Sequence, residues 1–230
     1  MSAPANPRRV WITRTLPRAQ ATAERVARLG LTPVVAPLLE ARFAPDAAID
    51  LAGIDALAFT SQHAGQGFAR LRRERRLPVF TVGRATADAA RAAGFAAVTS
   101  ADSDVRALAQ VIAAAAPRPQ RVLNPTAREP AADLAALLGR HGVAVVPVVV
   151  YATHRRPLRE ALDQVDAVLV HSARAAQALA AALAGDPGAG RLDAYAISEA
   201  AAAPLRGLGL RSIAVAAQPN EASLLALLEP

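Results

Sequence analysis

Two amino acids are missing from this sequence of 230 residues, and their absence excludes several kinds of chemistry. Cysteine is absent, which excludes disulfides, thiolate nucleophiles and cysteine-ligated zinc or iron–sulfur sites. Lysine is absent too, so all 26 basic residues are arginine. Without lysine there is no Schiff-base nucleophile, no anchor for pyridoxal phosphate and no Walker-type phosphate loop. Covalent catalysis through sulfur or a side-chain amine is therefore excluded.

Aromatic residues and histidines are scarce. Phe, Trp and Tyr make up 3% of the chain and apolar residues 53%, so we expect a core built from Ala, Val and Leu. The four histidines, His63, His141, His154 and His171, show no HExxH spacing. This argues against a metal enzyme, and we expect neither a metal ion nor a cofactor.

The excess of arginine gives a net charge of +7, which favours contact with anions of several kinds: nucleic acid, a membrane surface or an acidic metabolite. The densest basic stretch, residues 70–76, has no interleaved aromatic residues for base stacking, so we interpret it as a solvated helix end. The N-terminal stretch has no apolar signal core, and no uncharged run of about 18 residues occurs. We therefore expect a cytoplasmic protein that binds neither nucleic acid nor membranes.

A short pattern recurs along the chain: an apolar strand, a turn of small polar residues, and an Ala-rich helix that ends at glycine. Residues 10–13 are typical of a strand, and the helix that follows ends at Gly30. Residues 56–59 are followed by Thr60 and Ser61, which suit the N-cap of the next helix. Strands that alternate with helices indicate βαβ units, and hence an α/β fold with parallel sheets.

The second half of the chain repeats the first. Gly142 corresponds to Gly30 and Ser172 to Ser61, and such pairs are spaced by 111 to 116 residues along the whole repeat. We interpret this as an old duplication into two similar α/β units. Chance similarity between Ala-rich helices is the weaker explanation.

Several phrases of the sequence resemble the uroporphyrinogen-III synthase family. In chain order they are WITRTLPRAQATAERVARLGLTPVVAPLLE, ALAFTSQHAGQGF, VFTVGRATADAARAAGF, VVVYATHRR, SARAAQAL and QPNEASLLALL. Each phrase alone is a weak signal, but together they follow the order of the family over essentially the whole chain.

The resemblance implies two similar three-layer α/β domains with parallel sheets. The domains exchange their N-terminal strand–helix units and are joined by a two-strand linker. Domain one would combine residues 1–38 with 152–230, and domain two would be the continuous piece 42–149. The family also implies a monomer.

The linkers implied by the family would fall at about residues 36–43 and 147–153. Two Val- and Pro-rich stretches, residues 33–43 and 143–153, lie at corresponding points of the two halves. Their prolines favour edge strands or crossovers over central strands. The composition of the chain therefore points independently to the same two crossings.

The substrate of the family is hydroxymethylbilane, a linear tetrapyrrole with eight carboxylates. Loss of its terminal hydroxyl gives a cation that the pyrrole nitrogen stabilises. Attack at the substituted carbon of ring D then gives a spiro intermediate, and ring D is inverted as the macrocycle closes. This reaction needs positioning and a mild acid more than a covalent catalyst. The resemblance therefore implies a lyase of tetrapyrrole (haem, sirohaem and cobalamin) biosynthesis that works without a cofactor.

The candidate substrate-binding residues follow predicted strands, where helix N-termini in open α/β sheets attract carboxylates. They are Thr13, Arg14, Thr60, Ser61, His63, Gly83, Arg84, Thr86, Ser172 and Ser198. Some of them have simpler explanations. For Ser61 and Ser172 the simpler explanation is that each only caps a helix. For Arg14 and Arg84 it is a surface ion pair. His171, which directly precedes Ser172, is expected to face solvent.

Tyr151 is the predicted catalytic residue. It ends the apolar run VVVY at a point where the family has a Tyr, and its phenolic O–H is able to donate to the departing hydroxyl. Two alternatives stay open at this point: a core tyrosine whose hydroxyl is satisfied locally, and water as the proton donor.

Two departures from the family pattern concern the site. Ser198 and Ala201 stand where the family has a Gly-containing turn followed by Thr. The phrase NPTAREP, residues 124–130, replaces an Arg-Gly type turn, although Arg128 lies within it. An alternative hypothesis is therefore a catalytically weakened relative that only binds a tetrapyrrole or another polyanionic metabolite. A periplasmic-type binding protein and a Rossmann enzyme fit less well, because we find no signal core and no GxGxxG.

Overall fold

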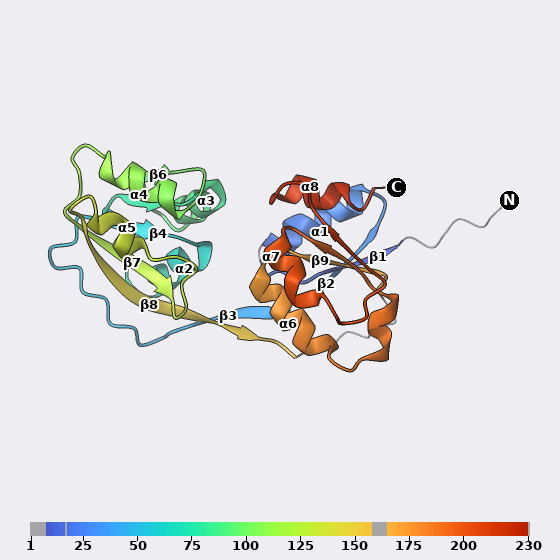
Figure 1. Ribbon diagram of the computed structural model, residues 1–230. Helices are drawn as coiled ribbons and strands as arrows, with labels where there is room; N and C mark the ends of the chain where they lie inside the picture. Colours follow the sequence, from blue (N-terminus) through green and yellow to red (C-terminus); the bar gives the residue numbers. More distant parts are fainter. Residues whose placement is uncertain (1–7, 17, 158–164, 230) are drawn as a thin grey trace. The chain divides into compact units, whose positions relative to one another are not determined.

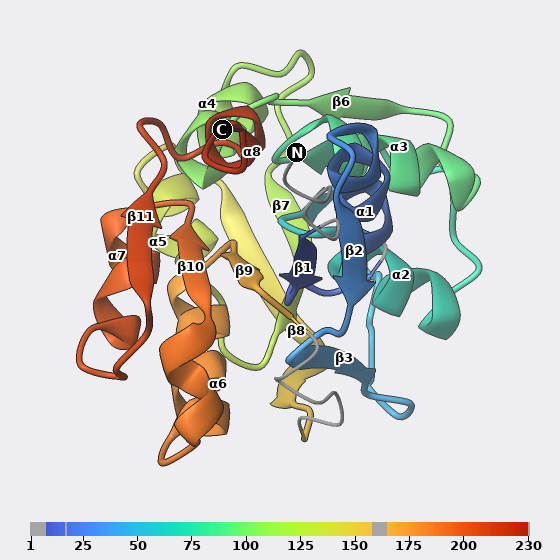
Figure 2. The same cartoon turned by 90° about the vertical axis from the view of Figure 1, so that its right-hand side faces the viewer.

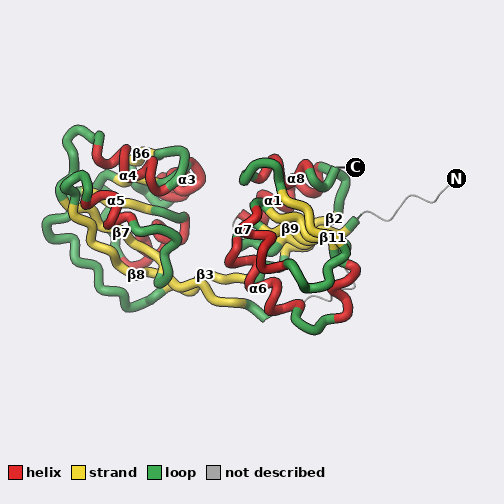
Figure 3. The backbone as a smooth tube through the Cα atoms, viewed as in Figure 1, coloured by secondary structure: helices red, strands yellow, loops and turns green. Residues whose placement is uncertain are grey.

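The chain forms two compact units in the computed structural model, which describes residues 8–16, 18–157 and 165–229. Unit 1 comprises Met1–Glu40 and His154–Pro230, and unit 2 comprises Ala41–Thr153. In each unit the strands form a middle layer with helices on both sides (Figures 1 and 3). The predicted fold class, two similar three-layer α/β units with parallel sheets, is confirmed.

The sheet of unit 1 has the order β11-β10-β9-β1-β2, and its paired strands are parallel (Figure 2). The strands are β1 (Arg9–Ile12), β2 (Thr32–Val35), β9 (Ala167–Val170), β10 (Asp193–Ala196) and β11 (Ser212–Val215). The inner strands β9 and β10 are buried on both faces, which explains the continuous apolar sequence of β9 and the apolar residues that follow Asp193 in β10. Pro33 lies in β2 at the sheet edge, where a missing N–H donor costs nothing.

Helices cover both faces of this sheet (Figure 1). On one face lie α1 (Arg18–Arg28) and α8 (Glu221–Ala226), and on the other lie α6 (Ala173–Leu183), α7 (Glu199–Ala202) and the 3-10 turns η2 (Pro187–Arg191) and η3 (Ala203–Leu205). Val10 and Ile12 pack with α1 while Trp11 packs with α6, as the two-residue period of a strand requires. The Trp11 indole N–H donates to the Ala36 carbonyl at 2.7 Å, so this buried ring leaves no polar atom unpaired.

The second sheet has the order β3-β8-β7-β4-β5-β6. Its strands are β3 (Leu39–Phe43), β4 (Ala56–Phe59), β5 (Val79–Thr81), β6 (Val98–Ser100), β7 (Arg121–Ala127) and β8 (Ala144–Arg155). The pairs from β4 to β8 are parallel. In contrast, β3 runs antiparallel to β8, because Arg156 N–H donates to Leu38 while Ala44 N–H donates to Val150.

The strands β3 and β8 carry the chain from one unit to the other. The division between the units falls between Glu40 and Ala41 in β3 and between Thr153 and His154 in β8. The first half of β8 pairs with β7, and the hydrogen bonds to β3 begin at Val150. At Pro147 the described hydrogen bonds of β8 run to β7, and those to β3 start three residues later. This part of β8 is therefore an edge strand, as its proline predicts.

The helices of unit 2 also lie on both faces of its sheet. On one face are α2 (Gln62–Leu71) and α3 (Arg84–Ala92), and on the other are α4 (Val105–Ala113) and α5 (Leu134–Gly139). Phe59, Phe68 and Phe95 pack together on the first face, with ring centroids 5.6 to 6.0 Å apart. The buried core is mostly Ala, Val and Leu, as expected, but on this face three of the scarce aromatic residues join it.

The two sheets show how the duplicated halves are assembled. The order β11-β10-β9-β1-β2 corresponds strand by strand to β6-β5-β4-β7-β8. The strands β1 and β2 come from the first half of the chain but pair with β9 to β11 of the second half. Conversely, β7 and β8 of the second half complete the sheet of β4 to β6. The predicted exchange of N-terminal strand–helix units is confirmed.

Local sequence signals explain the helix ends. Gly30 and Gly142 follow α1 and α5 with φ of +75° and +71°, the left-handed conformation that ends a helix and that glycine adopts without strain. No helix in the described part of the chain combines the length and apolarity needed to cross a bilayer.

Residues 70–76 include the solvated end of α2, as predicted, but two of the arginines in this stretch also bind backbone carbonyls. Arg72 Nε donates to the Ile49 carbonyl at 3.1 Å, and Arg75 Nε donates to the Ala93 carbonyl at 2.7 Å. The Arg75 guanidinium also lies 4.8 Å from the centre of the Phe95 ring. These side chains therefore fasten loops of unit 2.

Candidate functional site

Helix N-caps lie at the carboxyl ends of the parallel strands in both units. Ser61, Ser172 and Ser198 follow β4, β9 and β10, and each Oγ accepts a hydrogen bond from the backbone N–H three residues later, at 3.0, 3.1 and 3.4 Å. Gly83 caps α3 without a side chain, and a Cβ added there would meet nothing within 4 Å. These four predicted residues therefore begin helices at the edge of a parallel sheet, where ligands of such sheets bind.

Tyr151 is joined to the cap of α2. Its hydroxyl lies 3.1 Å from Ser61 Oγ, which already accepts the N–H of Ala64. The Ser61 hydrogen is then free to donate to the Tyr151 oxygen, and in that arrangement the phenolic hydrogen remains available to another acceptor. The backbone of Tyr151 is fixed separately, because its carbonyl accepts the Arg128 N–H at 2.9 Å.

The Tyr151 ring belongs to a group of three rings that we call the aromatic cluster: Phe43, His63 and Tyr151. The centroids of His63 and Tyr151 are 5.5 Å apart, and Phe43 lies 6.3 Å from His63 and 6.4 Å from Tyr151. The guanidinium of Arg70 lies 4.2 Å from the centre of the Phe43 ring. The cluster combines residues of β3, α2 and β8, so the fold brings two predicted residues, His63 and Tyr151, together with Phe43, which was not predicted. Arg70, against the Phe43 ring, was not predicted either.

Close packing of α2 against β8 holds this cluster in place. A Cβ at Gly67 would lie 2.7 Å from Val150 Cγ2 and 3.3 Å from Phe43 Cδ1, and one at Gly65 would lie 3.1 Å from the Phe59 ring. Real Cβ atoms do not approach as closely as the first of these distances. The Gly-x-Gly pair of α2 therefore serves helix–strand packing.

The other predicted residues of unit 2 have different environments. Thr60 is half-buried directly after β4. The Arg84 side chain is 83% exposed, with Nη2 4.0 Å from Asp102 Oδ2, so it forms the surface ion pair that was its alternative explanation. Thr86 is 2% exposed, and its hydroxyl has no hydrogen-bond partner among the described residues.

In unit 1, Thr13 and Arg14 follow β1. The Thr13 hydroxyl is buried and donates to the Leu169 carbonyl at 2.8 Å, which locks the ends of β1 and β9 together. Arg14 Nη1 donates to Glu221 Oε2 at 2.9 Å and to Thr22 Oγ1 at 3.2 Å. The predicted carboxylate ligand Arg14 therefore already holds a carboxylate, which comes from the first residue of α8.

Two further groups of α1 bind the same carboxylate. Thr22 Oγ1 donates to Glu221 Oε1 at 2.5 Å, and Arg25 Nη1 lies 3.2 Å from Oε2. Burial alone would raise the pKa of Glu221, but the Thr22 hydroxyl and the two guanidinium groups outweigh it, so the pKa lies below its ordinary value. Burial lowers the pKa of Arg14, and the Glu221 carboxylate opposes this shift.

His171 lies between β9 and the cap of α6. Both of its ring nitrogens are buried, and neither has a hydrogen-bond partner within the part of the chain that the structure describes. Burial and then the Arg14 charge lower the pKa of His171 to about 4, so its imidazole is neutral near pH 7. The expectation that His171 faces solvent is wrong for these nitrogens.

The two departures from the family pattern also have structural explanations. Ala201 is a fully buried residue of α7, so its methyl group packs against other apolar residues of the core. The stretch Asn124 to Ala127 belongs to β7, and the interpretation of NPTAREP as a turn is wrong for these residues. Asn124 Nδ2 donates to the Ala58 carbonyl at 2.8 Å, so the buried amide continues the strand contact with β4.

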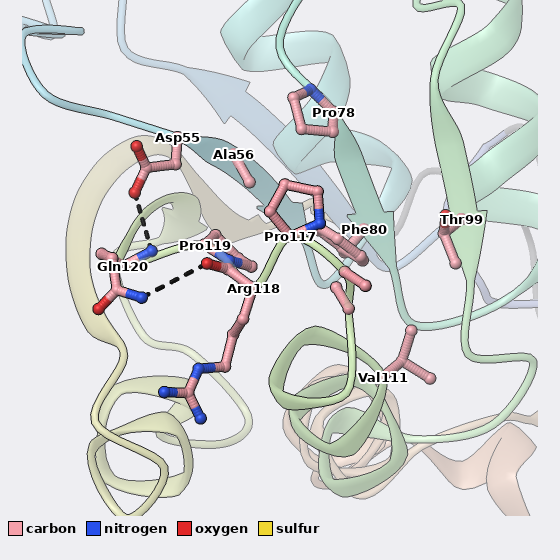
Figure 4. Close-up of a pocket in the computed structure, with 12 residues that line it drawn as sticks. Asp55, Ala56, Pro78, Phe80, Thr99, Val111, Pro117, Arg118, Pro119 and Gln120 are labelled. Carbon is pink, nitrogen blue, oxygen red and sulfur yellow. Dashed lines mark hydrogen bonds between the residues drawn. The ribbon is translucent and has the colours of Figure 1, made fainter.

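A cavity of about 580 Å³ lies elsewhere in unit 2, by the amino ends of β4 and β5 and the loop before β7 (Figure 4). Its lining includes Ala56, Phe80, Val111 and Pro117, and the Arg118 side chain extends away from Phe80 and Val111. None of the predicted site residues lines it. Among the described residues there is also no group of three or more His, Asp or Glu side chains placed to hold a metal ion.

Five contributors to these sites were not predicted: Phe43 and Arg70 in unit 2, and Thr22, Arg25 and Glu221 in unit 1. Phe43 is the last residue of a Val- and Pro-rich stretch that was assigned to a linker, and Arg70 was assigned to a solvated helix end. Glu221 follows the N-cap Asn220 of α8, and an acidic residue in that position is an ordinary helix-start signal. Only the fold brings it to Arg14, which lies 207 residues earlier.

Comparisons with known proteins agree on one family. A family profile described as uroporphyrinogen-III synthase HemD matches residues 20–226. Among solved structures, the chain is similar to the uroporphyrinogen-III synthetase of Helicobacter pylori, with a TM-score of 0.66 and 18% identity over 97% of this chain and 98% of that one. It is also similar to a mutant uroporphyrinogen III synthase of Thermus thermophilus, with a TM-score of 0.52 and 19% identity over 96% and 97% of the two chains. At this identity the structures establish the fold. A search of curated proteins finds no match.

Proposed function

Since the chain belongs to the uroporphyrinogen-III synthase family, we propose that it closes hydroxymethylbilane to uroporphyrinogen III, with inversion of ring D and loss of water. The observation that carries this proposal is the hydrogen bond between Tyr151 and Ser61 at the carboxyl edge of a parallel sheet. It gives the chain a positioned weak acid, which is the one chemical group that the reaction requires.

Tyr151 acts as the general acid in the first step. Its proton passes to the terminal hydroxyl, the carbon–oxygen bond breaks, and water leaves with the proton. The pyrrole nitrogen stabilises the resulting cation. Ser61 donates a hydrogen bond to the phenolic oxygen, which favours the phenolate left behind. Ser61 is fixed by its capping bond to Ala64, so the acid is aimed without a charged partner.

The later steps need shape more than further acid chemistry. The substituted carbon of ring D attacks the cation to form a carbon–carbon bond and a spiro intermediate. The older bond from that carbon to the methylene of ring C then breaks, which leaves a second pyrrole-stabilised cation, and the other α-carbon of ring D attacks this methylene so that ring D is inverted. Loss of a proton from the newly joined carbon restores the pyrrole and returns the proton to Tyr151. One water is released in total. The faces of Phe43 and His63 beside Tyr151 offer flat apolar contact to a pyrrole ring.

The carboxylates of the substrate are bound by the N-termini of helices and by neighbouring polar groups. We assign this role to the predicted set Thr13, Arg14, Thr60, Ser61, His63, Gly83, Arg84, Thr86, Ser172 and Ser198. The caps of α2, α3 and α6 support the assignment, because free N–H groups and the positive helix end favour carboxylates. We also propose that the two domains, with the bounds 1–38 plus 152–230 and 42–149, act in a cytoplasmic monomer without a cofactor.

The alternative is a relative that binds a tetrapyrrole but has lost efficient catalysis. Its support is Ala201, which supplies no hydroxyl where the family has Thr. The full burial of Ala201 weakens this alternative, since a side chain packed in the core does not reach a ligand.

A coupled assay tests the proposal. Hydroxymethylbilane is generated in situ, the purified protein is added, and the products are oxidised and separated into type I and type III uroporphyrin isomers. We expect mainly the type III isomer. Exclusive formation of type I, at the rate seen in buffer alone, would contradict the synthase proposal and favour the binding-only alternative.

A further inference from the structure

His171 has an unusual environment in the edge of unit 1. A neutral imidazole carries one N–H donor and one acceptor nitrogen, and burying such groups without hydrogen-bond partners is unfavourable. Both nitrogens of His171 are buried without a hydrogen-bond partner among the described residues. Packing alone does not explain a histidine at this position, because an apolar side chain would fill the same space and bury no unpaired nitrogen. A ligand that pairs with the imidazole would relieve the cost.

The charges beside His171 indicate what kind of ligand this is. Arg14 and His171 follow the paired strands β1 and β9, whose register sets Ile12 beside Leu169. The charges of Arg14, Glu221 and Arg18 all act on the pKa of the imidazole. Arg25 joins them through its ion pair with Glu221. Three guanidinium groups and one carboxylate leave an excess of positive charge next to a neutral N–H donor. This combination suits a carboxylate.

Glu221 shows where a carboxylate binds in this cluster. It accepts hydrogen bonds from Arg14 at 2.9 Å and from Thr22 at 2.5 Å. The side chains remain within reach of a ligand, because 15% of Arg14 and 22% of Glu221 is exposed. If Glu221 left Arg14, it would keep its contact with Arg25, which is 48% exposed and lies 3.2 Å away. A ligand carboxylate can therefore replace Glu221 at Arg14 without leaving the Glu221 charge buried and unpaired.

We propose that Arg14 and His171 form a carboxylate-binding subsite in unit 1, which Glu221 occupies until a carboxylate of the ligand displaces it from Arg14. The proposal rests on the proposed function only for the source of that carboxylate, a polycarboxylated tetrapyrrole. Glu221 is an internal competitor: it lowers the affinity of the site for carboxylates and favours release of the bound group.

Binding of uroporphyrin III to the full chain tests this proposal. The porphyrin is stable, carries the same eight carboxylates, and can be followed by quenching of the single tryptophan. Glu221→Gln should bind about tenfold more tightly than the unsubstituted protein, and Arg14→Gln about tenfold more weakly. In the double variant the gain from Glu221→Gln should disappear, because the competition for Arg14 is gone. Affinity of Glu221→Gln that is equal to or below that of the unsubstituted protein would overturn the proposal.

His171 is tested by two substitutions. His171→Leu removes both nitrogens and should weaken binding about fivefold, whereas His171→Asn keeps an N–H donor and should recover most of the affinity. Equal affinities for these two variants would remove His171 from the subsite.

A second route covers the case in which Glu221→Gln does not fold. Thr22→Val keeps the shape of the side chain and removes one of the bonds that hold Glu221, so it should tighten binding about threefold. Weaker or unchanged binding by Thr22→Val would then overturn the competition. The synthase proposal fails separately, through an isomer assay that yields only type I product, since these titrations measure equilibrium binding.

Discussion

The two units share one backbone frame but carry different side chains on it. Ser61 and Ser172 cap corresponding helices with nearly equal hydrogen bonds of 3.0 and 3.1 Å. The residue before the cap is Thr60 in unit 2 and His171 in unit 1. In unit 2 the cap is joined to the aromatic cluster, and in unit 1 the corresponding edge holds a cluster of charges. The frame was therefore kept after duplication, while a few positions on it came to carry different chemistry.

This difference indicates a division of labour. The acid group that we propose, Tyr151, lies in unit 2 among rings and beside a capping serine. The carboxylate subsite that we propose lies in unit 1, where Arg14 is already paired with an acidic side chain. Two kinds of substitution test whether unit 2 supplies the acid and unit 1 the carboxylate subsite. One kind puts the residue of one unit at the corresponding position of the other, and the second kind changes one unit and uses its counterpart as a control.

The largest expected effect follows from the replacement of His171 by its counterpart, His171→Thr. The unfolded chain binds a proton at this residue below about pH 6.5, but the folded chain does so only near pH 4, so the free energy of unfolding falls as the pH drops from 7 toward 4. The loss is about 3 kcal/mol for the unsubstituted protein, and His171→Thr should remove it. Trp11 fluorescence during urea unfolding reports on unit 1 and measures the effect.

The acidic groups of unit 1 act in a different pH range. The pKa values of Asp193 and Glu221 are lowered, so their stabilisation is lost only below their unfolded values of 3.8 and 4.5. The pH interval from 6.5 to about 5 therefore belongs to His171. If the free energy of unfolding changes with pH equally in His171→Thr and in the unsubstituted protein over that interval, the imidazole is not buried in its neutral form.

Tyr151→Phe is expected to have the next largest effect. Loss of the phenolic proton should lower kcat about 100-fold and leave KM within about twofold, because the ring still packs against its neighbours. The chain provides a matched control, since its other tyrosine, Tyr195, lies in unit 1: Tyr195→Phe should retain full activity. Equal activity of the two variants would assign the acid role to water.

Gly67→Ala tests how unit 2 holds its aromatic cluster. The added methyl group would overlap Val150 and should lower the free energy of unfolding by about 2 kcal/mol. Gly83→Ala is the control: open space surrounds that position, so its stability should fall by less than about 1 kcal/mol, the cost of Ala at a helix N-cap. Thermal unfolding compares the two, and equal melting temperatures would show that α2 can move away from β8.

The smallest effect separates capping from catalysis. Ser61→Ala and Ser172→Ala should each cost about 1 kcal/mol of stability, because each removes one capping hydrogen bond of similar length. Ser61→Ala should also lower kcat, and Ser172→Ala should not, since Ser61 is the serine that contacts Tyr151. If both variants lose kcat to the same extent, the hydrogen bond between Ser61 and Tyr151 has no specific role.

Much of the fold could be predicted because it depends on local signals. The glycines after α1 and α5, the serine caps and the apolar strands each act over a few residues, and their repetition reveals the duplication. The exchange of N-terminal units is not local, and it was predicted through resemblance to a family. Pro147 shows the limit of such signals. A proline here indicates an edge strand, and Pro147 is indeed exposed in β8, but nothing in the local sequence shows that β8 continues into the second unit.

The candidate sites were harder to predict, because they depend on contacts between distant elements. Nothing near Arg14 in the sequence reveals that Glu221 will bind it. The burial of the His171 nitrogens and the charges that lower its pKa come from residues far away in the sequence, so a histidine in a polar turn was predicted to face solvent. Phe43 contacts Tyr151 through the antiparallel pairing of β3 and β8, which a pattern of prolines and valines does not encode.

The exchange of strands also sets an order of assembly during synthesis. Unit 2 is one continuous stretch, complete once Thr153 has been added to the growing chain. In unit 1, the Arg9 backbone N–H binds the Asp166 carboxylate, whose residue is made 157 positions later. The apolar residues of β1 and α1 therefore stay uncovered after unit 2 is complete, until a chaperone or the C-terminal half of the chain covers them. A strand that is made early in this chain is in this way paired late.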